Sequence, residues 1–377
     1  MKILQVVPYF HPHVGGVESH ALALSEGLIK LGHEVTVLTT NHTNALPDVE
    51  FFHGIKIVRV STLGNLFNTP INPGIYTAIK RMDFEIAHLH YPPPLASFIA
   101  ALALVKMRKP YVLTYHCDVD IPVPLGSIIV EIYQSTMGRY TVENASKVIV
   151  HTKTYHATSR SIWNTEPAII PSAVDTTRFH PGKYSPEIRK KFHNAKIVLF
   201  VGRLVHQKGV EFLIESAKYL DHDTVVVIIG DGPERARLEE LVKIRKLEHK
   251  VFFTGKVSHE ELPEYYASAD VFVLPSTSRL EAFGLVITEA MACARPVVVS
   301  DIPGVNEVIE NEQEGLLSTP MVPEDIAKKI NTILHNPELA RKLGENGRKK
   351  VLERYEWIKI ARQVEEVYSQ VVSSSKR

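Results

Sequence analysis

The chain has 377 residues, which is long for one domain and suits two, because single hydrophobic cores stop growing at about 250 residues. Hydrophobic residues make up 45% of the sequence and charged residues 23%, a balance that excludes intrinsic disorder. The 43 lysines and arginines nearly cancel the 42 aspartates and glutamates, so no overall field attracts nucleic acid or a strongly acidic partner.

Neither the cysteines nor the first residues indicate secretion. Cys117 and Cys293 are the only cysteines, and two distant thiols form neither a disulfide framework nor a zinc knuckle, which fits a reducing cytoplasm. Residues 1–8, MKILQVVP, break too soon for the apolar core of a signal peptide. We therefore expect a cytoplasmic protein whose first residues form a buried strand.

The longest apolar stretch, Leu95–Val105, is shorter than the ~20 residues that a helix needs to cross a bilayer. It ends in a basic cluster formed by Lys106, Arg108 and Lys109. Two interpretations stay open for this stretch: a core helix with a basic end, or a peripheral contact with anionic lipid at the inner face of the membrane.

Short β-branched runs alternate with helical patterns in the first half of the chain. The runs are Ile3–Val7, Glu34–Leu38, Ile55–Val60, Ile86–Leu89, Tyr111–Thr114 and Val148–His151. Between the first two runs, apolar residues spaced as on one helix face predict a helix over Ser19–Leu31, which Gly32 ends. Strands that alternate with helices predict a parallel sheet with right-handed crossovers.

A charged connector begins near Pro181, and the alternation then starts again. The second series of predicted strands is Ile197–Val201, Val225–Ile229, Val251–Phe253, Val271–Leu274 and Pro296–Val299. The predicted helices among and after these strands are Val210–Leu220, Ala236–Leu247, Leu262–Ser268, Leu285–Ala294 and Pro323–Leu334. An amphipathic stripe predicts a last helix over Trp357–Val372, and the tail from Ser373 to Arg377 is expected to fray.

These patterns predict an α/β protein with two Rossmann-like, doubly wound parallel-sheet domains that face each other across a cleft. We expect residues 1–180 to form the N-terminal domain and residues 181–358 the C-terminal domain, with the C-terminal helix, residues 359–377, completing the first. In open sheets of this kind, ligands bind at the carboxyl ends of the strands.

A pair of glycines, Gly15 and Gly16, lies between the first predicted strand and the helix that follows it. Such residues let backbone amides approach a phosphate closely, and the helix N-terminus adds partial positive charge. The full dinucleotide-binding fingerprint is absent from this turn, so a tight turn that binds no ligand stays an alternative.

Two cations follow the first strand of the second series. Arg203 and Lys208 lie in the loop after Ile197–Val201, where open α/β sheets bind ligands. The planar guanidinium and the compact ammonium together suit the oxygens of a diphosphate. The alternative is a pair of solvated loop cations.

Two glutamates, Glu281 and Glu289, are separated by seven residues after the strand Val271–Leu274. A helix that begins near Gly284 would leave Glu281 in the loop before it and Glu289 more than a turn inside. The amides at the start of that helix attract an anion. Because a carboxylate beside an anion is electrostatically unfavourable, Glu281 is expected to accept hydrogen bonds from neutral hydroxyls. The arrangement suits a ligand whose phosphates are flanked by a sugar and a ribose, as in a nucleotide sugar. The alternative for Glu289 is an ordinary solvated carboxylate on a helix face.

Together these elements resemble the large family of retaining glycosyltransferases with the GT-B fold, the group four type with paired glutamates, also described as glycosyl transferases group 1. The resemblance spans nearly the whole chain. It rests on Gly15-Gly16, Tyr115–Asp118, Ile170–Asp175 with Phe179 and Pro181, Gly202-Arg203, Lys208-Gly209, Gly230–Pro233, Glu281–Gly284 and Glu289. Ser172-Ala173 and Asn306 depart from the family pattern, which leaves the donor preference open.

The resemblance implies a role for each of these residues. Arg203 and Lys208 would hold the donor diphosphate, and Glu281 would bind hydroxyls of the transferred sugar. His116 would touch that sugar near the reacting carbon, with a strand-end core histidine as the alternative. The residues expected to be catalytic are thus His116, Arg203, Lys208 and Glu281. The expected donor-binding residues are Gly15, Gly16, Gly202, Arg203, Lys208, Val257 at the base, Glu281, Phe283, Gly284, Leu285 and Glu289 at the ribose.

No cofactor or catalytic metal is expected, because the nucleotide sugar is a substrate and the resemblance implies metal-independent transfer. His88 and His90, alternate residues of one predicted strand, suggest a pair of metal ligands, but no third ligand follows from the sequence. We interpret them as strand-end or acceptor-side residues.

The resemblance further implies a UDP- or GDP-linked hexose donor held by residues 181–358, retention of configuration, and a sugar or lipid-linked acceptor hydroxyl bound by residues 1–180. One alternative is an epimerase-like sugar-nucleotide enzyme, which would lack the combination of Arg203, Lys208 and the glutamate pair. The other is a nucleotide-sugar-binding protein without transfer activity, against which His116, Glu281 and both cations argue.

Overall fold

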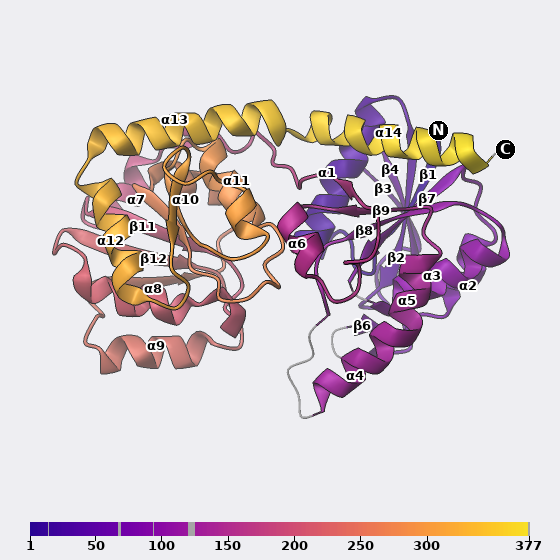
Figure 1. Ribbon diagram of the computed structural model, residues 1–377, viewed down its shortest axis with the longest axis horizontal. Helices are drawn as coiled ribbons and strands as arrows, with labels where there is room; N and C mark the ends of the chain where they lie inside the picture. The colour runs from indigo at the N-terminus through magenta and orange to yellow at the C-terminus, as the bar shows by residue number, and fades with distance from the viewer. Residues whose placement is uncertain (14, 67–68, 93, 120–124, 376–377) are drawn as a thin grey trace. The chain divides into compact units, whose positions relative to one another are not determined.

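The computed structural model describes residues 1–13, 15–66, 69–92, 94–119 and 125–375. The chain forms two compact units, whose elements are labelled in Figure 1. Unit 1 comprises Met1–Ser172 and Trp357–Arg377, and unit 2 comprises Ala173–Glu356.

The boundary between the units falls at Ser172 and not at residue 180, because the intervening segment is bonded to unit 2. Val174 forms a β-bridge with Glu356, and Arg348 donates to the Phe179 carbonyl at 3.0 Å. The chain returns to unit 1 at Trp357, two residues earlier than expected.

Unit 1 is built on an eight-stranded sheet in the order β10-β9-β8-β7-β1-β2-β4-β3. Its strands are β1 (Lys2–Val6), β2 (Glu34–Asn41), β3 (Val49–Phe52), β4 (Ile55–Ser61), β7 (Ile86–Tyr91), β8 (Tyr111–Tyr115), β9 (Lys147–Val150) and β10 (Ala168–Ile169). Its pairs are parallel except that β3 runs antiparallel to β4 at one edge. The central strands β7 and β8 are buried along their whole length, which explains why their sequences are continuous runs of mostly apolar residues.

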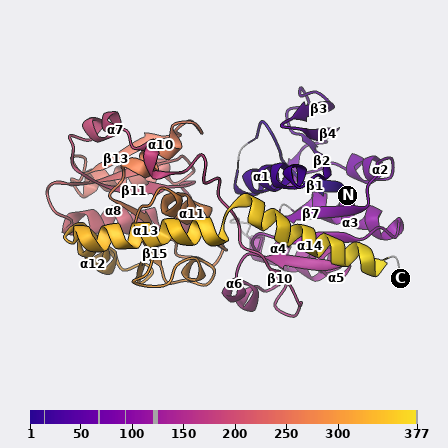
Figure 2. The ribbon, with the colours of Figure 1, turned by 90° about the horizontal axis from the view of Figure 1, so that it is seen from above.

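Helices flank this sheet, and a small two-stranded sheet, β5 (Asn65–Leu66) and β6 (Thr69–Pro70), lies outside it. The helices are α1 (Gly16–Lys30), α2 (Gly74–Ile79), α3 (Pro94–Lys106), α4 (Gly126–Tyr133), α5 (Arg139–Glu143), α6 (Lys153–Thr158) and α14 (Trp357–Ser375), with a π-helical turn at Gln134–Gly138. α14 packs against α1 (Figure 2). Because Ile360, Val364 and Tyr368 of α14 are buried, the last helix of the chain completes the core of unit 1.

Unit 2 contains a six-stranded parallel sheet in the order β13-β12-β11-β14-β15-β16. Its strands are β11 (Lys196–Val201), β12 (Thr224–Ile229), β13 (Val251–Gly255), β14 (Val271–Leu274), β15 (Val297–Ser300) and β16 (Gly315–Ser318). The chain builds outward from β11 in one direction and then returns to build outward from β14 in the other. The doubly wound sheet therefore has its topological switch point between β11 and β14.

The helices of unit 2 enclose this sheet. They are α7 (Pro186–Lys191), α8 (Val210–Ser216), α9 (Arg235–Ile244), α10 (Leu262–Ser268), α11 (Leu285–Ala292), α12 (Pro323–Leu334) and α13 (Pro337–Arg354). Short 3-10 turns occur at Pro181–Lys183, His206–Lys208, Ala217–Tyr219 and Val305–Glu307. α13 packs on α11 (Figure 1).

The sequence analysis missed β3, β16 and α13. The two strands are four residues long and lie at sheet edges. α13 contains Gly344 and Gly347, which interrupt a helical pattern. They serve close packing, since a β-carbon at Gly344 would come within 2.2 Å of the Ala294 carbonyl oxygen.

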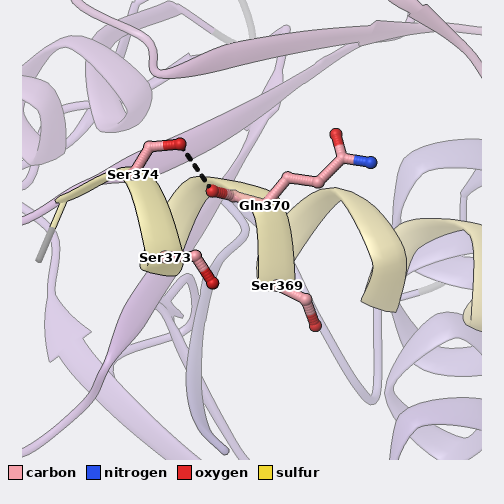
Figure 3. Close-up of a pocket in the computed structure, with 4 residues that line it drawn as sticks. All are labelled: Ser369, Gln370, Ser373 and Ser374. Carbon is pink, nitrogen blue, oxygen red and sulfur yellow. Dashed lines mark hydrogen bonds between the residues drawn. The ribbon is translucent and has the colours of Figure 1, made fainter. Parts of the chain in front are cut away.

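The tail that was expected to fray is helical as far as Ser375, so that prediction was wrong for Ser373–Ser375. Ser374 Oγ donates to the Gln370 carbonyl at 2.9 Å, and Ser375 Oγ donates to the Val371 carbonyl at 2.9 Å. Figure 3 shows the pocket beside this helix end, which among the described residues is lined by the uncharged side chains of Ser369, Gln370, Ser373 and Ser374. Residues 376 and 377 lie outside the described residues.

The apolar stretch of the sequence forms α3, whose Ala96, Ala100 and Leu104 are fully buried. The core-helix interpretation is therefore correct for its apolar residues. Across the described ranges, none of the helices combines the length and the hydrophobicity that crossing a membrane requires.

Candidate functional site

The switch point of the unit 2 sheet joins loops that are distant in the sequence. β11 and β14 are neighbours in the sheet, so the loops that follow them leave from the same edge. A backbone hydrogen bond connects these loops, since the Thr277 amide donates to the Gln207 carbonyl at 2.9 Å. The loop after β11 is also bonded to the loop after β12, where the Leu204 amide donates to the Asp231 carbonyl at 3.0 Å. Ligands of open α/β sheets bind at this position.

Gly209 lets the loop after β11 approach the loop after β14. Its φ is 62°, and a β-carbon there would come within 2.1 Å of the Pro275 carbonyl oxygen. Any other residue would force the loops apart. The pair Lys208-Gly209 therefore places a lysine directly against the loop that carries Glu281.

Lys208 and Glu281 form an ion pair through Nζ and Oε2. Ser276 Oγ donates to the same carboxylate oxygen at 3.2 Å. The two side chains are 17% and 13% exposed, so water screens their attraction only in part. The sequence analysis did not foresee that Glu281 neutralises Lys208.

Arg203 has a different environment from Lys208. Arg203 is exposed, and among the described residues its guanidinium forms no hydrogen bond or ion pair, whereas Lys208 is paired with Glu281. Of the two cations, Arg203 is therefore the one whose charge is not compensated by a carboxylate.

α11 begins at Leu285, as the sequence analysis expected from the positions of Glu281 and Glu289. Gly284 is the N-cap of the helix, with φ 76°, and Leu285 is its first residue. Phe283 is buried in the core of unit 2, which fixes the start of the helix. Glu281 consequently precedes the helix and Glu289 lies inside it, as the spacing predicted.

Glu289 accepts a hydrogen bond from the Tyr266 hydroxyl at 2.7 Å. Burial raises the pKa of Glu289 to about 7, although the Tyr266 hydrogen bond and the charge of Arg178 act in the opposite direction. Glu289 is therefore partly protonated near neutral pH and is not an ordinary solvated carboxylate on a helix face.

The remaining donor-site candidates of unit 2 lie along the same edge of the sheet. Gly202 follows β11 directly, and its amide donates to the Ile229 carbonyl at 3.0 Å. Val257 lies just beyond β13 and packs against the core of the unit. Because β13, β12, β11 and β14 are consecutive in the sheet, one extended ligand can lie across the loops that follow them.

In unit 1, Gly15 is the N-cap of α1 and Gly16 is its first residue. A β-carbon at Gly16 would meet no atom within 4 Å, so the residue has open space on that side. At Gly15 an added β-carbon would lie 2.4 Å from Glu18 Oε2. The hydrogen bond with Glu18 raises the pKa of His13. A phosphate at this turn would therefore compete with the Glu18 carboxylate.

His116 directly follows β8 and belongs to a chain of hydrogen bonds through three imidazoles. Gln5 Oε1 faces His90 Nε2 at 2.8 Å, and His90 Nδ1 faces His116 Nε2 at 3.1 Å. His116 Nδ1 then faces His151 Nε2 at 3.1 Å, and His151 Nδ1 faces the Ile170 carbonyl oxygen at 3.1 Å. Both ring nitrogens of His116 are thus engaged inside unit 1, so a sugar would bond to them only by displacing His90 or His151.

These rings are neutral at ordinary pH. Burial lowers the pKa of His90 and of His116 well below 6.5, and it lowers the pKa of His151 to about 4. His88 is a core residue: its Nδ1 faces the Tyr368 hydroxyl at 2.5 Å, its Nε2 faces Thr114 Oγ1 at 2.6 Å, and burial lowers its pKa to about 3.

The sequence analysis missed His20 and His151. His20 comes from α1, and its ring centroid lies 4.9 Å from that of His116. One signal was readable, because His90, His116 and His151 lie at or just after the carboxyl ends of the neighbouring strands β7, β8 and β9. No comparable signal marked His20, since its place depends on how α1 packs on the sheet.

Two doubly wound parallel-sheet units, each with a ligand-binding edge, are the architecture of the GT-B class of glycosyltransferases. Residues 184–350 match the family described as Glycosyl transferases group 1, and residues 14–178 match Glycosyltransferase Family 4. An uncharacterized glycosyltransferase of Methanocaldococcus jannaschii is 32% identical over 390 aligned positions, which cover 98% of each chain. The chain belongs to the group 1 family of glycosyltransferases.

Further relatives and solved structures agree with this assignment. The sulfoquinovosyl transferase SQD2 of Arabidopsis thaliana is 29% identical over 94% of this chain and 70% of its own length. The sucrose-phosphate synthase of Thermosynechococcus elongatus superposes with a TM-score of 0.80 at 26% identity, over 99% of both chains. HepE of Anabaena, solved with UDP and glucose, has the same fold, with a TM-score of 0.79 at 22% identity over 98% and 100% of the two chains.

These comparisons confirm the predicted GT-B fold and an enzyme that transfers glycosyl groups. They decide against both alternatives of the sequence analysis, the epimerase-like enzyme and the binding protein without transfer activity.

Proposed function

We propose that the protein is a retaining glycosyltransferase that moves a hexose from a UDP- or GDP-linked donor to a hydroxyl of a sugar or lipid-linked acceptor. The observation that carries this proposal is the meeting of Lys208 and Glu281 at the switch point of unit 2, beside the start of α11. Such a donor consists of a nucleoside diphosphate, which suits the Lys208 ammonium, and a sugar, whose hydroxyls suit the Glu281 carboxylate. The names of the relatives agree with a sugar donor, since SQD2 is a sulfoquinovosyl transferase and HepE was solved with UDP and glucose.

Breaking the anomeric carbon–oxygen bond places negative charge on the departing diphosphate, so catalysis falls mainly on the leaving group. Arg203, Lys208 and the first amides of α11 would stabilise that charge, each charged hydrogen bond contributing on the order of 1.5–3 kcal/mol. A bound diphosphate would attract the Lys208 ammonium away from Glu281. The freed carboxylate would then accept hydrogen bonds from the sugar hydroxyls.

The other residues would orient the donor. Glu289 would bind the ribose and Val257 the base, while the amides of Gly15 and Gly16 would approach the diphosphate from unit 1. The acceptor hydroxyl would attack from the face that the leaving group occupies, and the departing phosphate oxygen would take its proton. In this scheme Glu281 is no nucleophile, and no metal or cofactor takes part in the transfer.

Two substitutions test the leaving-group site. Arg203→Ala and Lys208→Ala should each lower the turnover of a UDP- or GDP-sugar by about 100-fold or more, because each removes a cation from the developing charge. The measurement is release of nucleoside diphosphate together with transfer to an added acceptor. Lys243→Ala is the control, since that lysine is 67% exposed on the same unit.

Circular dichroism should show that all three variants fold. If turnover stays at the wild-type level in both the Arg203 and the Lys208 variant, the proposed leaving-group site is wrong.

A further inference from the structure

Arg178 lies in the first segment of unit 2, directly before the buried Phe179. Its amide donates to Asp175 Oδ1 at 3.1 Å, which fixes the backbone of this turn. Its guanidinium packs over the Phe179 ring, 4.8 Å from the ring centroid. The side chain of Arg178 is therefore held in one direction, and the residue is half-buried.

The guanidinium of Arg178 also holds the loop that joins β13 to α10. Its two terminal nitrogens contact His259 at the ring Nε2 and at the carbonyl oxygen. Because a guanidinium only donates hydrogen bonds, His259 Nε2 accepts and the ring is neutral. Partial burial and the charge of Arg178 lower the pKa of His259, which agrees with this form. The contacts fix the loop two residues beyond Val257, the residue that would bind the base.

On its other side, Arg178 acts on the Glu289 carboxyl. The Phe179 ring beneath the guanidinium packs edge-on against Tyr266, with the centroids 5.7 Å apart, and the Tyr266 hydroxyl donates to Glu289. Burial raises the pKa of Glu289, and the Tyr266 hydrogen bond and the charge of Arg178 both oppose this rise. Cys293, one turn further along α11, stays uncharged, because burial raises its pKa to about 12.

Glu289 is the carboxylate that most influences the charge of Arg178. Burial lowers the pKa of Arg178, and among the carboxylates that oppose this effect Glu289 comes before Asp175 and Glu260. His259 supplies no negative charge, since it offers a neutral ring and a carbonyl oxygen. Arg178 thus combines a contact with the loop of Val257 and an electrostatic interaction with Glu289.

The form of the Glu289 carboxyl matters for a ribose. A ribose presents two neighbouring hydroxyls, and a carboxylate accepts a hydrogen from both, whereas a protonated carboxyl carries a hydrogen of its own. A positive charge nearby favours the carboxylate. We propose that Arg178 is a positioning residue of the donor site, which joins the loop that would bind the base to the carboxylate that would bind the ribose; this role rests on the proposed function.

Calorimetry of the full-length protein with UDP, GDP and their 2′-deoxy forms tests this role. The wild type should prefer the ribonucleotide by about tenfold or more above neutral pH, for one charged hydrogen bond. The preference should shrink as the pH falls through about 7, where Glu289 takes up a proton. The ratio of the two affinities cancels the titration of the diphosphate, which both nucleotides share.

Two substitutions separate the charge of Arg178 from its contact with His259. Arg178→Gln removes the charge and keeps an amide donor, so the preference for the ribonucleotide should shrink at a higher pH than in the wild type. Arg178→Lys keeps the charge and loses the two-point contact. It should bind UDP or GDP about tenfold more weakly, with the preference shrinking near the wild-type pH.

Arg341→Gln is the matched control, because Arg341 is 64% exposed on α13 of the same unit. It should change neither the affinity nor the pH dependence. Thermal unfolding should show that all three variants fold.

Each part of this role has a result that overturns it. A Gln variant whose preference shrinks at the wild-type pH overturns it even if binding is weaker, since Arg178 would then only hold the loop. A Lys variant with wild-type affinity overturns it too, as does a wild type that binds the ribonucleotide and its 2′-deoxy form equally. These results leave the diphosphate site of the proposed function intact. A wild type that binds neither UDP nor GDP refutes the donor site itself, and the role of Arg178 with it.

Discussion

Glu281 is paired with Lys208 in the protein without a donor. Removing this carboxylate should therefore have opposite effects on nucleotide binding and on sugar transfer. Glu281→Gln removes the carboxylate that competes with the diphosphate for the lysine. The variant should therefore bind free UDP or GDP more tightly, by about tenfold for one charged hydrogen bond of about 1.5 kcal/mol, while its turnover falls because the sugar loses its partner. Calorimetry with the free nucleotide and a transfer assay measure the two effects. Weaker nucleotide binding together with lower turnover would instead show that Glu281 positions Lys208 for the diphosphate and does not compete with it.

The raised pKa of Glu289 makes the stability of the protein depend on pH. The carboxyl titrates near 4.5 when unfolded and at about 7 when folded, so the folded state holds an extra proton between these values. The stability from this group is complete below pH 4.5 and is lost as the pH rises through 7. Glu289→Gln, which keeps an acceptor for Tyr266, should therefore be more stable than the wild type at about pH 8, by up to about 3 kcal/mol.

Urea unfolding at about pH 5 and about pH 8 measures this difference, which should shrink toward the lower pH. A variant that is less stable than the wild type at both pH values would show that the carboxylate is charged and stabilising in the folded protein.

At the scale of loops and helices, substitutions of two glycines at the proposed donor site should have different effects on stability. Gly209→Ala places a β-carbon within 2.1 Å of the Pro275 carbonyl oxygen at a φ of 62°, so it should destabilise unit 2 by roughly 2–4 kcal/mol. Gly16→Ala meets no atom within 4 Å and should change the free energy of unfolding by less than about 0.5 kcal/mol. Denaturant unfolding separates the two variants.

Gly16→Ala also tests the turn of unit 1 as a binding element. If its amide approaches the diphosphate, the variant should fold normally and lose turnover. Wild-type turnover in a normally folded Gly16 variant would remove the glycine turn from the donor site.

The helices, strands and loops also differ in how well the sequence could predict them. Buried strands such as β8 and β14 are mostly apolar runs, and helices between them carry an apolar stripe. The order of these elements along the chain and the positions of the strand-end loops therefore followed from the sequence pattern alone. α13 did not, because Gly344 and Gly347 meet a packing demand that only the folded unit creates. The Lys208–Glu281 ion pair and the position of His20 also escaped prediction, since both depend on how loops and helices from distant parts of the chain pack.

At the scale of the whole molecule, unit 2 is one continuous segment, Ala173–Glu356, with its own core. It contains every proposed donor-binding residue except Gly15 and Gly16. Expressed alone, it should fold cooperatively and be stabilised by UDP or GDP, by about 2.7 kcal/mol at a hundred times the dissociation constant. Thermal shift with UDP, GDP and ADP measures this and ranks the bases. Equal, negligible shifts with all three nucleotides would place the donor site elsewhere.

Unit 1, by contrast, is discontinuous, because its residues up to Ser172 are joined by a helix that begins at Trp357. On the ribosome, the surface of α1 that α14 covers must wait until the whole of the second unit has been synthesised. Unit 2 can bury its core before the residues from Trp357 onward are made, whereas unit 1 reaches its final form only after them. Chaperone dependence during synthesis should therefore be greater for unit 1 than for unit 2.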